Sequence, residues 1–442
     1  MGTFRFAVQT LFSDKKSTLF YGFTLFISIA ITFVFFGIVG NETLLKLASE
    51  QFIELGGYAN PADIAQMLKY IPTLLTFVII FICIMCVFFA NSFYIVGKSK
   101  YIAFMTLGGA GFFNIAYYVF FQNLLIAIVA VPLGLIGGYL GYAGICSLLF
   151  SVMNVTANPF ALTFGLIFNT VFLVFMILIW IMLIDAGYTY RLKIVDLFND
   201  ERRMNTARIQ SSSIKSWLYL MITILPLISL VIYDTNAVGY LMFLTLSIVG
   251  LSGVLKNTIP QFTIYLKKKC YQINPIKIIS LNNYKASIKS CYFLIQIIIS
   301  STLFLVGFVV SFENNEYYFT LMIFAMAVVF ILMAISIIYK QLIEAYSRVK
   351  AYNGLSKVGY TNKQLRKAVN QELFLFFTTI IGLILMILVP YLGILSSKSL
   401  FSLEWTLVII SMITGLLIIT ALVTRKMYMQ IVLPVQLRNE VE

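Results

Sequence analysis

The chain has 442 residues, of which 61% are hydrophobic and 11% charged, and its mean hydropathy is +0.96. A soluble domain carries about 25% charged residues, so this composition excludes a soluble globular protein. Several apolar runs exceed the roughly 20 residues that a helix needs to cross a bilayer. No ten-residue alternation typical of an outer-membrane barrel occurs. We therefore expect an all-α polytopic membrane protein.

Hydropathy and the polar residues between apolar runs divide the chain into ten predicted transmembrane helices. The first follows an amphipathic segment in which Phe4, Val8 and Leu11 share one helical face with Phe12. The loop before the second predicts a short helix of its own, because Pro61 follows a capping residue. The predicted spans are 18–39, 71–95, 116–146, 162–185, 217–233, 238–255, 291–311, 318–339, 373–394 and 404–424.

The basic residues are distributed very unevenly between the two sides of the predicted membrane domain. Both termini and the loops after even-numbered spans carry 28 of the 31 Lys and Arg residues. The positive-inside rule places these segments in the cytoplasm. The net charge of +14 then reflects topology and contact with anionic lipid, rather than a nucleic-acid partner.

An internal repeat relates two cytoplasmic segments. A constant offset of 250 residues pairs Lys98 with Arg348, Gly109 with Gly359, and Gln122 with Glu372. Two further similar stretches, "KSTLF" at Lys16 and "KSCYF" at Lys289, each begin the first of the two spans that precede these segments. Such a duplication predicts two related halves about a pseudo-twofold axis along the membrane normal.

The repeat predicts three parts in the chain. Residues 1–186 hold an amphipathic helix and spans 1–4, 187–255 a linker and a two-helix hairpin, and 256–442 an amphipathic segment and spans 7–10. In each half, a short basic segment after the second span carries an apolar face ending in glycine. In the first half this face comprises Ile102, Met105 and Leu107. Two equivalent cytoplasmic surfaces predict two equivalent soluble partners.

The stretch "ANSFYIVGKSKYIAFMTLGG…QN" resembles the signature of FtsX/MacB-type (type VII) ABC transporter permeases. The ten-span layout, with two FtsX-like four-helix halves joined by a hairpin, is most similar to the bacitracin-resistance (BceB-like) branch. Two departures stand out. Tyr101 occupies a position where the family usually has an acidic residue, and "ENNEYY" joins spans 7 and 8 where that branch has a large extracellular domain.

The resemblance implies a permease subunit in a bacterial plasma membrane, with both termini cytoplasmic. It would couple two copies of a cytoplasmic ABC ATPase, which bind ATP and Mg, to export or membrane expulsion of a peptide or amphipathic compound. It implies short coupling helices at the basic segments. The residues expected to contact the ATPase are Lys98, Lys100, Ile102, Met105, Leu107, Gly108, Gly109, Lys350, Leu355, Val358, Gly359 and Tyr360.

The chain itself has no GxxxxGK[ST] phosphate loop and no His, so we expect neither ATP hydrolysis nor another enzymatic activity in it, and no cofactor of its own. Resistance to antimicrobial peptides and peptide secretion are both open. The alternative is an ATP-independent scaffold that binds a sensor kinase or a cell-wall hydrolase.

Three further patterns bear on function. Asp185, Glu372 and Glu404 lie near predicted span ends, where we expect water to reach them. Cys83 and Cys86 have CxxC spacing but lie inside an apolar span, which favours small apolar fillers over a metal or redox site. The glycines of "PLGLIGGYLGYAG" have the small-xxx-small spacing of closely packed membrane helices.

Overall fold

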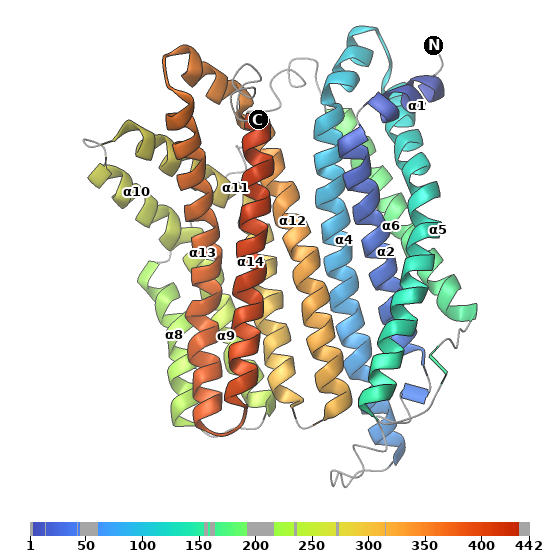
Figure 1. The fold of residues 1–442 in the computed structure, drawn as a ribbon, viewed down its shortest axis with the longest axis vertical. Coiled ribbons are helices and arrows are strands. Elements are labelled where there is room, and N and C mark those ends of the chain that lie inside the picture. Colours follow the sequence, from blue (N-terminus) through green and yellow to red (C-terminus); the bar gives the residue numbers. More distant parts are fainter. Residues whose placement is uncertain are drawn as a thin grey trace. The chain divides into compact units, whose positions relative to one another are not determined.

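Every regular element among the described residues is a helix (Figure 1). The computed structural model describes residues 3–13, 15–41, 43–44, 61–153, 158–159, 164–191, 216–233, 237–270, 274–313 and 315–432. The elements are α1 (Thr3–Ser13), α2 (Lys15–Val39), α4 (Pro61–Leu107), α5 (Phe112–Val152), α6 (Phe164–Arg191), α8 (Ser216–Ile232), α9 (Ala237–Gly253), the π-helical η2 (Val254–Thr258), α10 (Ile259–Cys270), α11 (Pro275–Ser311), α12 (Glu316–Lys357), α13 (Asn362–Ser397) and α14 (Leu403–Val432).

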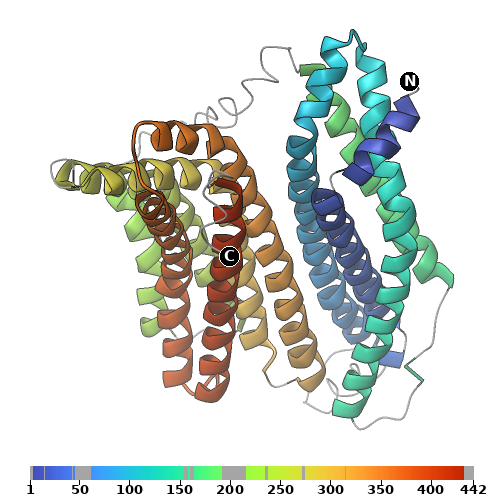
Figure 2. The ribbon, with the colours of Figure 1, turned by 45° about the horizontal axis from the view of Figure 1, so that its top comes forward.

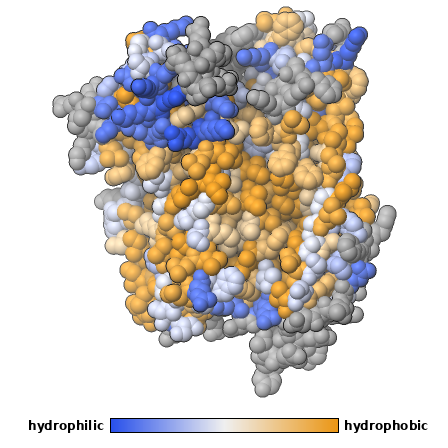
Figure 3. All heavy atoms as spheres, in the orientation of Figure 1, coloured by the Kyte–Doolittle hydropathy of each residue, from blue (hydrophilic) through white to orange (hydrophobic). Residues whose placement is uncertain are grey.

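Nine helices within the described ranges are long and apolar enough to cross a membrane. They confirm the expected all-α, multi-pass membrane protein. The predicted span 217–233 corresponds to α8, which is apolar but has only 17 residues. The count of ten spans and the two-half layout stay predictions. Figure 3 shows a broad hydrophobic band across the helices, with hydrophilic residues gathered where α10 and the α12–α13 turn lie.

Two helices run further than hydropathy predicts. α4 begins at Pro61, as the capping pattern indicates, but it continues through the predicted loop helix, the span and the basic residues to Leu107. α12 likewise continues from Glu316 to Lys357. The separate short coupling helices implied by the family resemblance do not occur. The physical reason is that neither Lys nor Arg ends a helix, whereas a glycine in the left-handed conformation does.

The helices form two compact units. The first comprises residues 1–199 and 314–336, and the second comprises 200–313 and 337–442. In the first, α2 packs against α4, α5 and α6, and α1 packs against α5 (Figures 1 and 2). In the second, α11 packs against α9 and α13, and α13 packs against α14. The division at residues 186 and 255 predicted from the repeat stays a prediction.

The glycine-rich stretch of α5 allows close contact with α2, as the spacing predicts. A Cβ atom on Gly134 would lie 2.8 Å from the Ile29 side chain, and one on Gly138 would lie 2.7 Å from Phe33. Small residues at such contacts let two helix backbones approach, which is a main source of helix association in lipid.

We expect Gly138→Ile to destabilise the first unit by about 1–3 kcal/mol, because the new side chain would force α2 and α5 apart. The matched control is Gly144→Ile on the same helix, since a Cβ atom there meets nothing within 4 Å. The measurement is the temperature at which the buried Cys146 thiol begins to react with a maleimide dye in detergent. Equal reaction temperatures for the two variants would contradict the packing assigned to Gly138.

Candidate functional site

Two tight helical turns correspond to the segments predicted to contact a partner. We define the first tip as residues 104–111, between α4 and α5, and the second tip as residues 354–361, between α12 and α13. α4 ends at Leu107 and α5 begins at Phe112, whereas α12 ends at Lys357 and α13 begins at Asn362. The offset of 250 residues therefore relates both boundaries of the two tips.

The first tip ends α4 with a Schellman motif, in which a left-handed residue reverses the chain. The amide of Ala110 donates to the carbonyl of Met105 at 3.0 Å, and the amide of Gly109 donates to the carbonyl of Thr106 at 3.1 Å. Gly109 has φ +80°, a conformation that costs L-residues with a side chain roughly 1–2 kcal/mol. The glycine is therefore required by the turn itself.

The second tip repeats this geometry. The amide of Tyr360 donates to the carbonyl of Leu355 at 3.1 Å, and the amide of Gly359 donates to the carbonyl of Ser356 at 3.1 Å. Gly359 has φ +105°. Each bond is the counterpart, 250 residues later, of a bond in the first tip. The amide of Thr361 also donates to Gln364 Oε1 at 3.0 Å, and this bond caps the start of α13.

The predicted contact residues differ in exposure. Two of them, Lys98 and Ile102, are buried, and three are half-buried, namely Met105, Leu355 and Tyr360. The others are exposed: Lys100, Leu107, Gly108, Gly109, Lys350, Val358 and Gly359. Leu107 is 60% and Val358 79% exposed, and Phe104, which sequence reasoning missed, is 71% exposed. Ile102 instead packs in the chain's own cluster with Ala7. The exposed residues form the surface available to a partner, and the buried ones position it.

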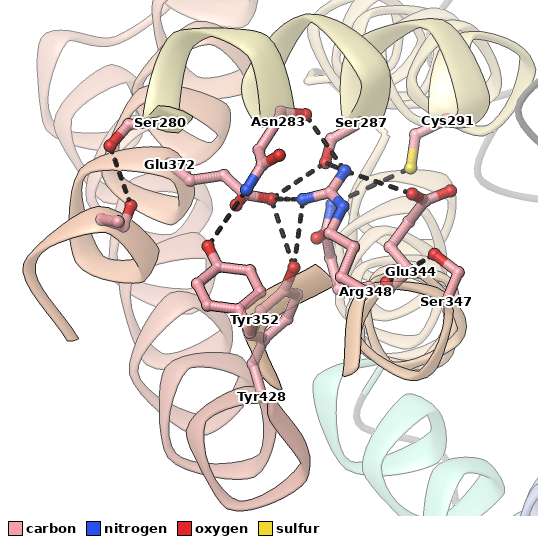
Figure 4. Close-up of polar contacts among 12 residues, drawn as sticks. Ser280, Asn283, Ser287, Cys291, Glu344, Ser347, Arg348, Tyr352, Glu372 and Tyr428 are labelled. Atoms are coloured by element: carbon pink, nitrogen blue, oxygen red, sulfur yellow. Dashed lines mark hydrogen bonds and ion pairs between the residues drawn. The ribbon is translucent and has the colours of Figure 1, made fainter. Parts of the chain in front are cut away.

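A buried polar network lies behind the second tip (Figure 4). At its centre, the guanidinium of Arg348 on α12 binds both Glu344, one turn earlier at 3.2 Å, and Glu372 on α13. The side chain of Glu344 is 2% exposed and that of Glu372 is 0% exposed. An arginine with several donors in a fixed fork suits such a site, because it satisfies two carboxylates at once.

The same guanidinium reaches two further helices. Its Nη2 donates to the carbonyl of Asn283 at 3.0 Å and to Ser287 Oγ at 2.8 Å, both on α11. Its Nη1 donates to the hydroxyl of Tyr428 on α14 at 3.1 Å. Arg348 thus connects α11, α12, α13 and α14 beside the second tip. Figure 4 shows the side chains of Ser287 and Tyr428 directed toward the guanidinium.

A second network lies behind the first tip, centred on Lys98 of α4. Its Nζ donates to the carbonyl of Thr10 on α1 at 2.9 Å and lies 5.4 Å from the ring centroid of Tyr94. Gln122 of α5 donates to Thr10 Oγ1 at 2.9 Å and to the Tyr118 hydroxyl at 3.0 Å. Tyr94 in turn donates to Gln122 Oε1 at 3.0 Å.

The two networks have corresponding parts. In each, a basic residue of the helix before the tip donates to a main-chain carbonyl of another helix: Lys98 to Thr10 on α1, and Arg348 to Asn283 on α11. In each, the residue paired by the 250-residue offset, Gln122 or Glu372, belongs to the network. The basic residues therefore stabilise the helices next to the tips from within the protein. From the sequence alone, Lys98 is instead expected to lie on the contact surface.

The expectation that water reaches all three carboxylates near span ends is wrong for two of them. Asp185 is 2% exposed and Glu372 is 0% exposed, whereas Glu404 is exposed. Asp185 accepts hydrogen bonds from Asn91 and Asn123, and Glu372 binds Arg348. Polar residues inside apolar helices must pair with one another, so these asparagines were the signal that sequence reasoning could have used.

The CxxC cysteines are buried, as predicted: Cys83 is 1% and Cys86 0% exposed. Cys86 Sγ donates to the carbonyl of Leu332 at 3.6 Å. Among the described residues, no group of three or more His, Cys, Asp and Glu side chains could hold a metal ion.

No protein-family model matches the chain, and no curated protein matches it.

Proposed function

We propose that the chain is the membrane-spanning permease subunit of a bacterial ABC-type transporter, located in the plasma membrane with both termini in the cytoplasm. Two copies of a separate cytoplasmic ATPase, which hold ATP and Mg, bind the two tips. The chain transmits their movement to its helices and so expels a peptide or amphipathic compound from the membrane. It performs no ATP chemistry itself.

The observation that carries this proposal is the repetition of one turn geometry at the two predicted contact segments. Both tips have a left-handed glycine, the same two backbone hydrogen bonds and exposed apolar residues. Two turns with the same backbone geometry suit a dimeric soluble partner, because the same patch of each partner subunit can bind one of them.

The buried networks support a mechanical role for the tips. Lys98 joins α4, the helix before the first tip, to α1, and Arg348 joins α12, the helix before the second tip, to α11. A push on an exposed residue such as Leu107 or Val358 would therefore move several helices together rather than bend a free loop. This arrangement fits coupling between a motor outside the membrane and helices inside it.

Co-purification from the native membrane tests the proposal. We expect the tagged full-length chain, solubilised in mild detergent, to retain a polypeptide that carries a GxxxxGK[ST] phosphate loop and hydrolyses ATP. Mass spectrometry identifies the polypeptide, and phosphate release measures its activity. Recovery of a sensor kinase or a cell-wall hydrolase without an ATPase would overturn the proposal and favour the scaffold alternative.

A further inference from the structure

A cavity of about 300 Å³ lies in the first unit, between the start of α5 and the end of α6. Four aromatic residues form much of its wall, and several of them are exposed on the outside of the helices. The aromatic lining residues are Phe112, Phe113, Tyr117 and Phe120. Asn123 and Asp185 supply the polar part of the lining.

The carboxylate at this cavity is buried and bound by two amides. Asn91 Nδ2 donates to Asp185 Oδ1 at 2.6 Å, and Asn123 Nδ2 donates to Asp185 Oδ2 at 2.7 Å. Asp185 and Asn91 are each 2% exposed, and Asn123 is 0% exposed. The three side chains come from α6, α4 and α5, so three helices fix the position of the carboxylate.

The positive partner of this carboxylate is missing from the described part of the chain, where no Lys or Arg forms an ion pair with Asp185. The amide oxygens of Asn91 and Asn123, both buried, also accept no hydrogen bond from the described residues. Of these residues Asp185 and Asn123 line the cavity, and their oxygens have capacity to accept more hydrogen bonds. A buried charge without a counter-charge is costly, so such a site favours a bound cation.

We propose that this cavity binds the ammonium group of an amphipathic organic cation. Asp185 supplies the counter-charge, and the faces of the aromatic residues attract the cation and cover its alkyl part. Because the lining aromatics are exposed on the outer surface of α5, the ligand enters from the lipid. This site needs no ATPase, so the inference goes beyond the proposed function and does not depend on it.

The second unit offers a natural comparison. Its cavity of about 510 Å³ lies between α13 and α14 and is lined by Asn370, Gln371, Phe374 and Arg425, among others. Its charged lining residue is thus basic where that of the first cavity is acidic. An ammonium ligand should therefore prefer the first cavity, and a change at Arg425 serves as the matched control.

Equilibrium binding tests the site on the full-length chain in a neutral maltoside detergent, with radiolabelled dodecyltrimethylammonium as the probe. We expect saturable binding of one molecule per chain, displaced by unlabelled dodecylammonium but not by dodecanol. Asp185→Asn should weaken binding at least about tenfold, because it removes the charge and keeps the shape. Arg425→Gln should leave the affinity unchanged.

A second variant keeps the test decisive if Asp185→Asn does not fold. The double substitution Phe113→Leu and Tyr117→Leu removes exposed aromatic faces, and we expect it to weaken ammonium binding several-fold. The proposal is overturned if both variants bind the ammonium probe as wild type does, or if dodecanol displaces it as well as dodecylammonium. Loss of binding in Arg425→Gln alone would place the site in the second unit and likewise overturn it.

Discussion

Replacing Arg348 with Met is expected to destabilise the second unit by about 3–5 kcal/mol. The substitution keeps most of the apolar volume but leaves Glu344 and Glu372 buried without their counter-charge. It also removes the bonds that join α11 and α14 to this centre. The measurement is the temperature at which the buried Cys291 thiol, read by peptide mass spectrometry, becomes reactive in detergent.

Two controls separate this effect from a general intolerance of the helix. Lys350→Met changes an exposed residue two positions away on α12 and should alter the unfolding free energy by less than about 0.5 kcal/mol. Combining Arg348→Met with Glu344→Gln and Glu372→Gln removes the whole charged centre and should recover much of the loss. A stable single variant would show that the network does not hold the four helices together.

The largest expected functional effect comes from placing a negative charge on each tip. The double variant Leu107→Asp and Val358→Asp should reduce the recovery of the ATPase at least about tenfold, because a carboxylate in an apolar contact loses its hydration. Each single variant should retain part of the binding, since a dimeric partner can still hold one tip. Both residues are exposed, so the fold should not change.

The control for this prediction is Leu403→Asp, which alters a 65% exposed leucine at the opposite predicted side of the membrane. It should leave ATPase recovery and ATP turnover at the wild-type level. If the double tip variant retains the full amount of ATPase, the tips are not its binding surface. Quantitative mass spectrometry of the purified complexes, normalised to the tagged chain, compares the wild type with all four variants.

Hydropathy predicted most of the helices correctly, because membrane spanning requires long apolar runs and the sequence displays them directly. The glycines of the tips could also be predicted as turn positions. A left-handed helix end has a strong residue preference, so Gly109 and Gly359 carry a local signal. Features set by neighbouring residues were therefore readable from the chain.

Features set by distant residues were not readable. Lys98 looked like the end of a span, but its ammonium binds a carbonyl 88 residues earlier and α4 continues past it. Asp185 looked water-accessible, but asparagines from two other helices enclose it. In both cases tertiary contacts bury an ionisable group that hydropathy can only treat as the boundary of a span. The repeat offset of 250 residues paired Lys98 with Arg348 and Gln122 with Glu372, but it did not predict that Arg348 binds Glu372.

In the proposed transporter, both tips contact the same cytoplasmic ATPase. The most direct measurement is site-specific photocrosslinking in native membranes, with benzoylphenylalanine placed at position 107 or at position 358. We expect both positions to form adducts with one polypeptide that carries a GxxxxGK[ST] phosphate loop. Adducts with a kinase or a hydrolase alone, or an ATPase adduct at neither position, would contradict the proposal.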